Sequence, residues 1–169
     1  MTRARIHEHR ASTPLQSLLA FGKRIPFREC ATVSASSHEF FDHTSELGLR
    51  ILAPTFADVL AEAARALGEV MLRGQAASAV GPWRSLVVRA TDREALLVDW
   101  LNELIFHAET EHWIAVEVEV ETADDTKVTA LARGASVAEA PSWVKAVTHH
   151  RLSVREEEGG LVAEVVLDV

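Results

Sequence analysis

Hydrophobic residues in this chain follow two kinds of period, and both begin near residue 38. Two strand-like runs come first, at 38–44 and 47–53, and Pro54 stops the second of them. Five later runs are apolar or alternate apolar with polar residues, and they are predicted as strands: 83–90, 114–121, 127–133, 144–155 and 161–169. Residues 1–37 show no sustained period. The pattern predicts a β-rich domain, 38–169, that follows a loosely ordered arm, 1–37.

Two longer segments have the period of amphipathic helices. The first is predicted to begin with Thr55 as its N-cap, supported by Asp58, and to end before Arg73-Gly74. The second is predicted to begin at Thr91 as N-cap, supported by Glu94. Its buried stripe is expected to be Leu97, Trp100, Leu101, Leu104, Ile105 and Ala108. Both apolar faces are too broad for isolated helices, so each helix is expected to pack on a sheet.

The order of these elements is two strands, a helix, a strand, a helix and four further strands. Residues 134–143 are predicted as a loop. The run Glu156 to Gly160 is a hairpin signal, because its glycines can adopt the positive φ that tight turns need. The order predicts a single-domain α+β fold, with a mostly antiparallel β-sheet or sheets covered by two α-helices.

Charge divides the chain at the same place as the hydrophobic pattern. The 169 residues carry a net charge of −8. Residues 1–37 hold six basic and two acidic side chains, which is +4 and leaves −12 for the rest. A domain this acidic is a poor electrostatic match for the phosphate backbone of a nucleic acid. Direct nucleic-acid binding by residues 38–169 is therefore not expected. Cations or basic protein surfaces are better partners.

Size and composition exclude several other classes of protein. The chain is long enough for one domain with a real core, and it has no apolar run near the ~18 residues of a membrane helix. Its one cysteine, Cys30, rules out an internal disulfide framework and fits a reducing compartment, so a cytoplasmic protein is expected. Common enzyme signatures do not occur: there is no glycine-rich phosphate loop, Gly-x-Ser-x-Gly, His-Glu-x-x-His or Cys-x-x-Cys.

The histidines give little support to a zinc site. His107 and His112 are five apart, off the i, i+4 face that a shared helical site needs. His149 and His150 are adjacent on a predicted strand, so they point to opposite sides. His150 is in step with the apolar side of that strand, and it is predicted to be a core histidine. This side comprises Val144, Ala146, Thr148, Leu152 and Val154.

Carboxylates at the end of the chain are the stronger candidates for chemistry. In the last predicted strand the odd positions are apolar, whereas Glu164 and Asp168 lie on the other side. The α-carboxylate of Val169 lies within a few ångströms of Asp168, since the two are neighbours in sequence. One further acid would complete a hard-oxygen site for Ca²⁺ or Mg²⁺. The alternative is a solvated strand end, and the spacing alone does not indicate which acid would join.

Four sequence blocks resemble the archease family. Residues 39–50, EFFDHTSELGLR, are similar to a family signature that has an acidic-aromatic start, Asp-His-Thr-Ala-Asp, and an apolar-Gly-apolar-Arg tail. Three further blocks agree in order and spacing: 97–104, 144–150 and 165–169. The resemblance covers roughly 38–169, and four blocks in register are far more specific than any one of them.

The resemblance implies a non-catalytic accessory protein of a GTP-dependent RNA ligase. Archeases promote guanylylation and repeated turnover of the ligase that seals tRNA exon halves and other broken RNAs. They are small α+β proteins with an acidic metal-binding cluster. The family's ligand positions correspond here to Glu46, Asp168 and Val169, which would hold a divalent cation such as Ca²⁺, Mg²⁺ or Mn²⁺. Residues expected to contact the ligase or its guanylate are Lys145, His43, Glu109 and His150.

The chain departs from the family pattern at several positions. Glu46 replaces the usual Asp, which keeps the charge but moves the oxygens outward by one methylene. The family's Asp-Thr-Glu-Gly reads Glu109-Thr110-Glu111-His112 here, and His149 stands where an aromatic residue is common. Residues 1–37 match nothing in the family.

Two other functions stay open from the sequence. One is a metal-dependent hydrolase that uses the same acids, with His150 as its base. The other is a chaperone-like modulator of an RNA-modifying enzyme, which would act through its apolar faces rather than through its acids.

Overall fold

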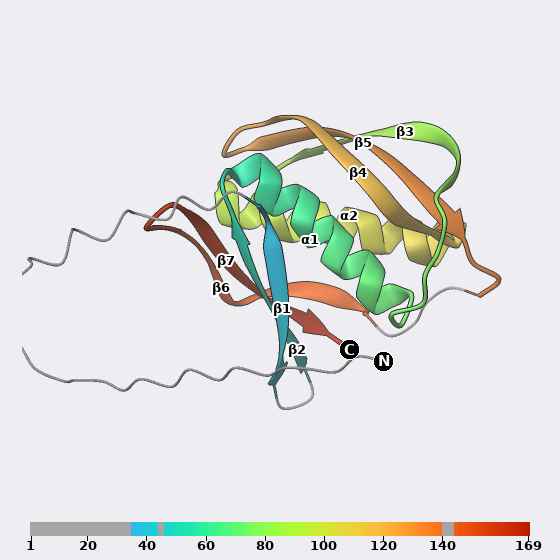
Figure 1. The fold of residues 1–169 in the computed structure, drawn as a ribbon, viewed down its shortest axis with the longest axis horizontal. Helices are drawn as coiled ribbons and strands as arrows, with labels where there is room; N and C mark the ends of the chain where they lie inside the picture. Colours follow the sequence, from blue (N-terminus) through green and yellow to red (C-terminus); the bar gives the residue numbers. More distant parts are fainter. Residues whose placement is uncertain (1–34, 44–45, 140–143) are drawn as a thin grey trace, which may run out of the picture.

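The computed structural model describes residues 35–43, 46–139 and 144–169. Its elements, coloured along the chain in Figure 1, are β1 (Ser37–His43), β2 (Glu46–Ala53), α1 (Phe56–Met71), β3 (Val80–Arg89), α2 (Arg93–Glu111), β4 (Trp113–Ala123), β5 (Lys127–Ser136), β6 (Ala146–Glu157) and β7 (Gly160–Asp168). The predicted order of elements and the α+β class are confirmed. The predicted arm falls outside the described residues as far as residue 34, so its loose order stays a prediction.

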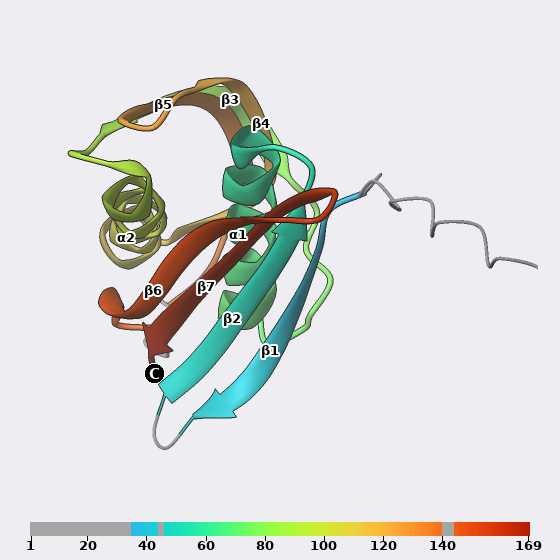
Figure 2. The ribbon, with the colours of Figure 1, turned by 90° about the vertical axis from the view of Figure 1, so that its left-hand side faces the viewer.

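The strands form two antiparallel sheets with the helices between them. The first sheet has the order β1-β2-β7-β6 and the second has the order β3-β5-β4. Figure 2 shows α1 and α2 as a middle layer, with the second sheet above them and the first sheet below. Each helix therefore packs on both sides, which explains the broad apolar faces in the sequence.

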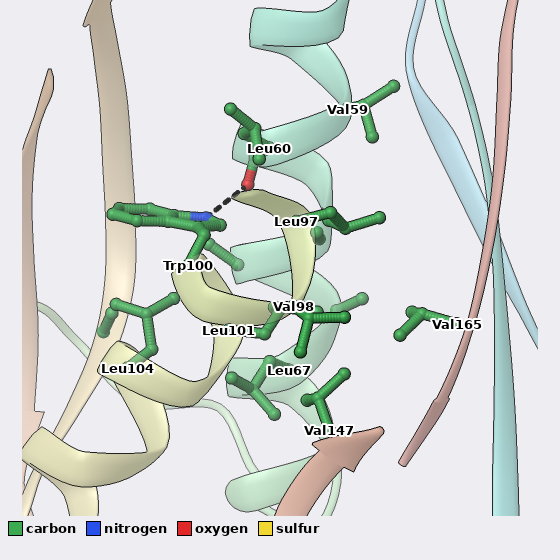
Figure 3. Close-up of a cluster of buried hydrophobic side chains, with 14 of the residues drawn as sticks. Val59, Leu60, Leu67, Leu97, Val98, Trp100, Leu101, Leu104, Val147 and Val165 are labelled. Atoms are coloured by element: carbon green, nitrogen blue, oxygen red, sulfur yellow. Dashed lines mark hydrogen bonds between the residues drawn. The ribbon is translucent and has the colours of Figure 1, made fainter. Parts of the chain in front are cut away.

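The core lies at the level of the two helices, where both sheets contribute side chains. Trp100 of α2 is fully buried, and its indole N–H donates a 3.0 Å hydrogen bond to the carbonyl of Leu60 in α1 (Figure 3). A buried indole N–H needs such a partner, and this bond fixes one helix against the other. All six residues of the predicted α2 stripe are buried.

The helix ends follow capping rules, with one error in the prediction. Thr55 caps α1 by accepting a 3.2 Å hydrogen bond from the backbone N–H of Asp58, as predicted. The N-cap of α2 is Asp92 rather than Thr91; its carboxylate accepts a 2.8 Å bond from the N–H of Ala95. That hydrogen bond, followed by one from the Thr91 hydroxyl, lowers the pKa of Asp92. A carboxylate is the better cap because the helix N-terminus carries partial positive charge.

Several strand boundaries differ from the predicted ones, and β3 begins at Val80, inside the predicted loop, rather than at Trp83. Residues 134–136, predicted as loop, continue β5, because Gly134 lets Trp113 lie directly against the backbone. A Cβ at Gly134 would come within 2.2 Å of the Ile114 carbonyl oxygen. Strand β6 begins at Ala146 rather than at Val144. The β6–β7 hairpin turns at Gly159, which has a φ of 92°.

Among the described residues, no helix has both the length and the apolar character to cross a membrane.

The end of α2 suggests a stabilising substitution. His112 is the C-cap of α2 and has a left-handed backbone, with φ 53° and ψ 39°. Residues other than glycine pay a conformational penalty there. We expect His112→Gly to raise the free energy of unfolding by roughly 0.5–1 kcal/mol, measured by urea denaturation. The control is Glu109→Gly, one turn earlier within the helix, which should lower stability by about the same amount.

An equal loss of stability in both variants would show that the His112 side chain contributes more than its backbone costs.

Candidate functional site

The pairing of β2 with β7 places Glu46 directly opposite Asp168. The register runs without interruption from Glu46↔Asp168 to Ala53↔Leu161. Directly paired residues on antiparallel strands share a face, with Cβ atoms about 4.5–5.5 Å apart. Both side chains are half-buried and lie on the face of the first sheet that points away from the helices, which we call the outer face. The spacing of the last strand did not indicate which further acid would lie beside Asp168. The β2–β7 register brings Glu46, the first residue of β2, to that place.

The chain terminus and Lys145 lie at the same end of the sheet. Figure 2 shows the C-terminus beside the start of β2. The backbone N–H of Lys145 donates a 2.8 Å bond to the carbonyl of Asp168. The Lys145 ammonium group lies 3.3 Å from a carboxyl oxygen of Val169. Two side-chain carboxylates, one terminal carboxylate and one ammonium group therefore gather at this corner of the molecule.

The donor set at this corner suits a hard cation in its chemistry. Carboxylate oxygens are the ligands that Ca²⁺ and Mg²⁺ prefer. Within the described part of the chain, no group of three or more His, Cys, Asp or Glu side chains is suitably placed to hold a metal ion. The further oxygen donor at this corner is the carboxyl group of Val169, and the Lys145 ammonium group lies 3.3 Å from it.

The other predicted contact residues are only partly brought together. The backbone of His43 pairs with Glu46 across the β1–β2 turn, so His43 belongs to the same row of the sheet. Glu109 is exposed near the end of α2, on a different element from the carboxylates. His150 is exposed on β6. Sheet pairing places the backbone of His43 opposite Glu46, and a backbone hydrogen bond joins Lys145 to Asp168. Glu109 belongs to α2, and His150 belongs to the irregular part of β6.

The prediction that His150 is a core histidine is wrong. The β6–β7 pairing is irregular between Thr148 and Ser153, and Arg151 within this stretch has a left-handed φ of 55°. The irregularity changes which residues face the core: Val147 is buried before it, and Leu152 packs against the core after it. A strict alternation from residue 144 to 155 therefore assigned the first half of the strand to the wrong side.

Sequence reasoning missed an aromatic side chain next to the acidic pair. Phe41 is 38% exposed, and its ring lies over Gly48 on the outer face. A Cβ at Gly48 would come within 2.1 Å of this ring, so only glycine leaves room for it. Gly48 is opposite Val166, two pairs along from Glu46↔Asp168 and therefore next to it on the same face. The signal in the sequence was a glycine inside an apolar strand with an aromatic residue in the strand before it.

A buried charged cluster fastens β1 to α1 near the N-terminal end of β1, at the opposite end of that strand from His43. Glu62 is 7% exposed and accepts hydrogen bonds from Arg65 Nε at 3.1 Å and Nη2 at 2.6 Å. Nδ1 of His38 lies 2.8 Å from Glu62 and 3.0 Å from Arg65. The Arg65 hydrogen bonds, with a smaller contribution from His38, lower the pKa of Glu62 against the opposing effect of burial. The cluster holds the sheet's edge strand in place, and that strand also carries Phe41 and His43.

Most of the chain is similar in sequence to the members of one protein family. The model of the Archease protein family matches residues 38–169. The archease of Methanothermobacter thermautotrophicus is 34% identical over 137 residues, which covers 78% of this chain and 97% of the relative. The archease of Archaeoglobus fulgidus is 32% identical over 138 residues, with coverages of 78% and 98%. The family match begins at residue 38, so it leaves out the preceding residues.

Two solved structures share the fold. The solution structure of a Methanobacterium thermoautotrophicum protein has a TM-score of 0.62 and 32% identity, and the match covers 78% of this chain and 98% of that one. A crystal structure from Thermotoga maritima, described as an archease and possible chaperone, has a TM-score of 0.52 and 18% identity, with coverages of 76% and 94%. The second likeness supports the fold alone.

The charged cluster predicts a pH dependence of stability. Because the pKa of Glu62 in the folded protein lies below its ordinary value of 4.5, its contribution is fully present above that pH. The contribution is lost as the pH falls through the lowered pKa. We expect Glu62→Gln to cost about 1–3 kcal/mol at pH 7 and to flatten the decline in stability below pH ~5. Urea denaturation of both proteins between pH 7 and pH 3 measures this.

Glu69→Gln is the matched control. Glu69 is half exposed and lies 4.0 Å from Arg65 and 3.5 Å from His38. Exposed ion pairs contribute little, so its replacement should cost less than about 1 kcal/mol. Parallel pH profiles for wild type and Glu62→Gln would contradict the assignment.

Proposed function

The chain belongs to the archease family, and we propose that it is a non-catalytic accessory protein that activates a GTP-dependent RNA ligase. One observation carries the proposal. The uninterrupted β2–β7 register brings Glu46, from the signature block of the family, opposite Asp168, from its terminal block. Two blocks more than a hundred residues apart in sequence thus meet in one acidic corner, at the positions where the family resemblance expects cation ligands.

In this proposal the acidic corner holds a divalent cation for the ligase. Glu46, Asp168 and the terminal carboxylate of Val169 would be its ligands. A divalent cation, when bound, would neutralise negative charge on the phosphates of the ligase's nucleotide. The carboxylates of this chain supply charge and orientation, and β-sheet pairing fixes their spacing.

Lys145 is proposed to respond to the cation. Its ammonium group lies 3.3 Å from the Val169 carboxyl group, and a cation at that carboxylate would repel it. Lys145 is exposed, so its side chain can turn towards solvent or towards a guanylate phosphate. The same side chain would then balance the acids in the free protein and contact the partner in the complex.

A chaperone-like role is the second candidate, since one relative with the same fold is described as a possible chaperone. Exposed apolar side chains of the second sheet and α2 would serve it: Val80, Trp83, Val87 and Phe106. Such a role would not depend on Asp168, which is on the first sheet.

Cation binding can be measured on the protein alone. We expect the full chain to bind Ca²⁺ or Mn²⁺ in calorimetric titration, and Glu46→Gln and Asp168→Asn each to weaken binding at least ~10-fold, about 1.4 kcal/mol. Lys145→Met should strengthen binding, because it removes the competing ammonium group. Glu121→Gln, an exposed carboxylate on β4, is the control and should bind as the wild type does. Equal affinities throughout the series would rule out the proposed ligands.

Ligase activation is measured with the partner present. We expect the full chain to increase guanylylation of a GTP-dependent RNA ligase over multiple turnovers, and Glu46→Ala or Asp168→Ala to reduce the stimulation at least ~10-fold. Glu121→Ala should stimulate normally. Stimulation that survives Asp168→Ala would favour the chaperone-like role. Hydrolysis of phosphodiesters by this protein alone would overturn the non-catalytic assignment.

A further inference from the structure

Strand β4 is an edge strand whose open side faces helix α1. It is at the end of the order β3-β5-β4, so it pairs with β5 on one side only. The two elements touch at Gly68, where an added Cβ would come within 2.6 Å of the Ala115 carbonyl oxygen. That oxygen therefore points at the helix. An edge strand presents unpaired backbone N–H and C=O groups, which are a template for another extended chain.

Two neighbouring cavities lie along this helix–strand contact, and Gly68 and Ala115 line the smaller one. On one side of Gly68 a cavity of about 420 Å³ lies between α1 and residues 116–119 of β4. On the other side a cavity of about 230 Å³ continues towards the loop at residues 74–77. The two cavities share Arg65 and Val116 in their walls. We call the whole feature the seam groove.

The seam groove has the length of a short peptide. Its walls follow α1 from Asp58 to Leu72, which at 1.5 Å per residue is roughly 21 Å. An extended chain covers that distance in about six residues. An extended peptide can add to an exposed sheet edge as a further strand.

The walls of the seam groove are acidic. Five carboxylates line them, against one guanidinium, that of Arg65: Asp58, Glu62, Glu69, Glu117 and Glu119. Glu62 and Glu69 lie beside Arg65, and Glu117 is bonded to Arg133 at 2.5 Å. Among the described residues, Asp58 and Glu119 take part in no ion pair, and they give the groove its negative charge.

These features together point to a basic occupant. We propose that the seam groove binds an extended, lysine- or arginine-bearing segment of a partner protein, which pairs with the open edge of β4. The acids repel a second copy of β4, whose exposed side chains at 117, 119 and 121 are also glutamates. The groove thus favours a basic segment over self-association. This surface is on the second sheet and does not depend on the cation site.

The test uses the full chain and a labelled eight-residue peptide of alternating arginine and valine. We expect fluorescence anisotropy to show that this peptide binds at low salt and that its affinity falls as the salt concentration rises. An alternating glutamate–valine peptide should not bind. The arginine peptide with N-methylated backbone amides should bind at least ~10-fold more weakly, because it keeps its charge but cannot pair with a strand. Equal binding by the methylated peptide would reduce the interaction to charge alone and overturn the proposal.

Two variants locate the site. Glu119→Lys should weaken arginine-peptide binding at least ~10-fold. Glu156→Lys, the same charge change in the β6–β7 hairpin of the other sheet, should have little effect. Equal losses of peptide affinity in the two variants would mean that the peptide responds to the overall negative charge of the protein. That result would contradict binding in the seam groove.

The chain's own basic N-terminal residues are the competing occupant. A truncated chain that begins at residue 35 retains residues 38–169, the whole part that the family model matches. Peptide binding by this truncated chain but not by the full chain would assign the groove to residues 1–34 and overturn the partner proposal. Equal binding by both chains supports it.

Discussion

The register of β2 against β7 is the constraint on which the rest of the structure depends. Eight consecutive pairs align without a bulge. This alignment turns Leu49, Ile51 and Ala53 towards the helices together with the odd residues of β7. A slip of one residue would turn the core residues of one strand outward and separate Glu46 from Asp168. Burial of the core and assembly of the acidic corner are consequences of the same hydrogen-bond ladder.

Strand β1 connects the two electrostatic features of the first sheet. At one end His38 reaches a buried acid–arginine pair on α1, which fixes this edge strand to the helix layer. At the other end His43 is opposite Glu46, beside Asp168 and the chain terminus. Between them Phe41 lies over Gly48 and shields the centre of the outer face. The edge strand is held by polar contacts on one side and by a glycine–aromatic contact on the other.

Local patterns were sufficient to predict the elements but not how the strands pair. The helices and strands followed from periodicity because each element has to bury one face. The errors arose where a competing contact decided the outcome: Asp92 displaced Thr91 as the cap of α2, and Trp113 packing on Gly134 extended β5. The irregularity in β6 had no sequence signal, because Arg151 is not a residue type that favours positive φ. Strand pairing depends on contacts between distant residues, so the sequence located Glu46 beside Asp168 only through family resemblance.

The order in which the paired strands are synthesised has a consequence for folding. β2 is among the first elements made, and its partner β7 is the last. During translation, one edge and one apolar face of β2 therefore stay uncovered until β7 has been made. Closing so long a loop carries a large entropic cost before any ladder bond compensates it. The acidic corner therefore cannot form before β7 pairs with β2, because that pairing alone brings Glu46 opposite Asp168.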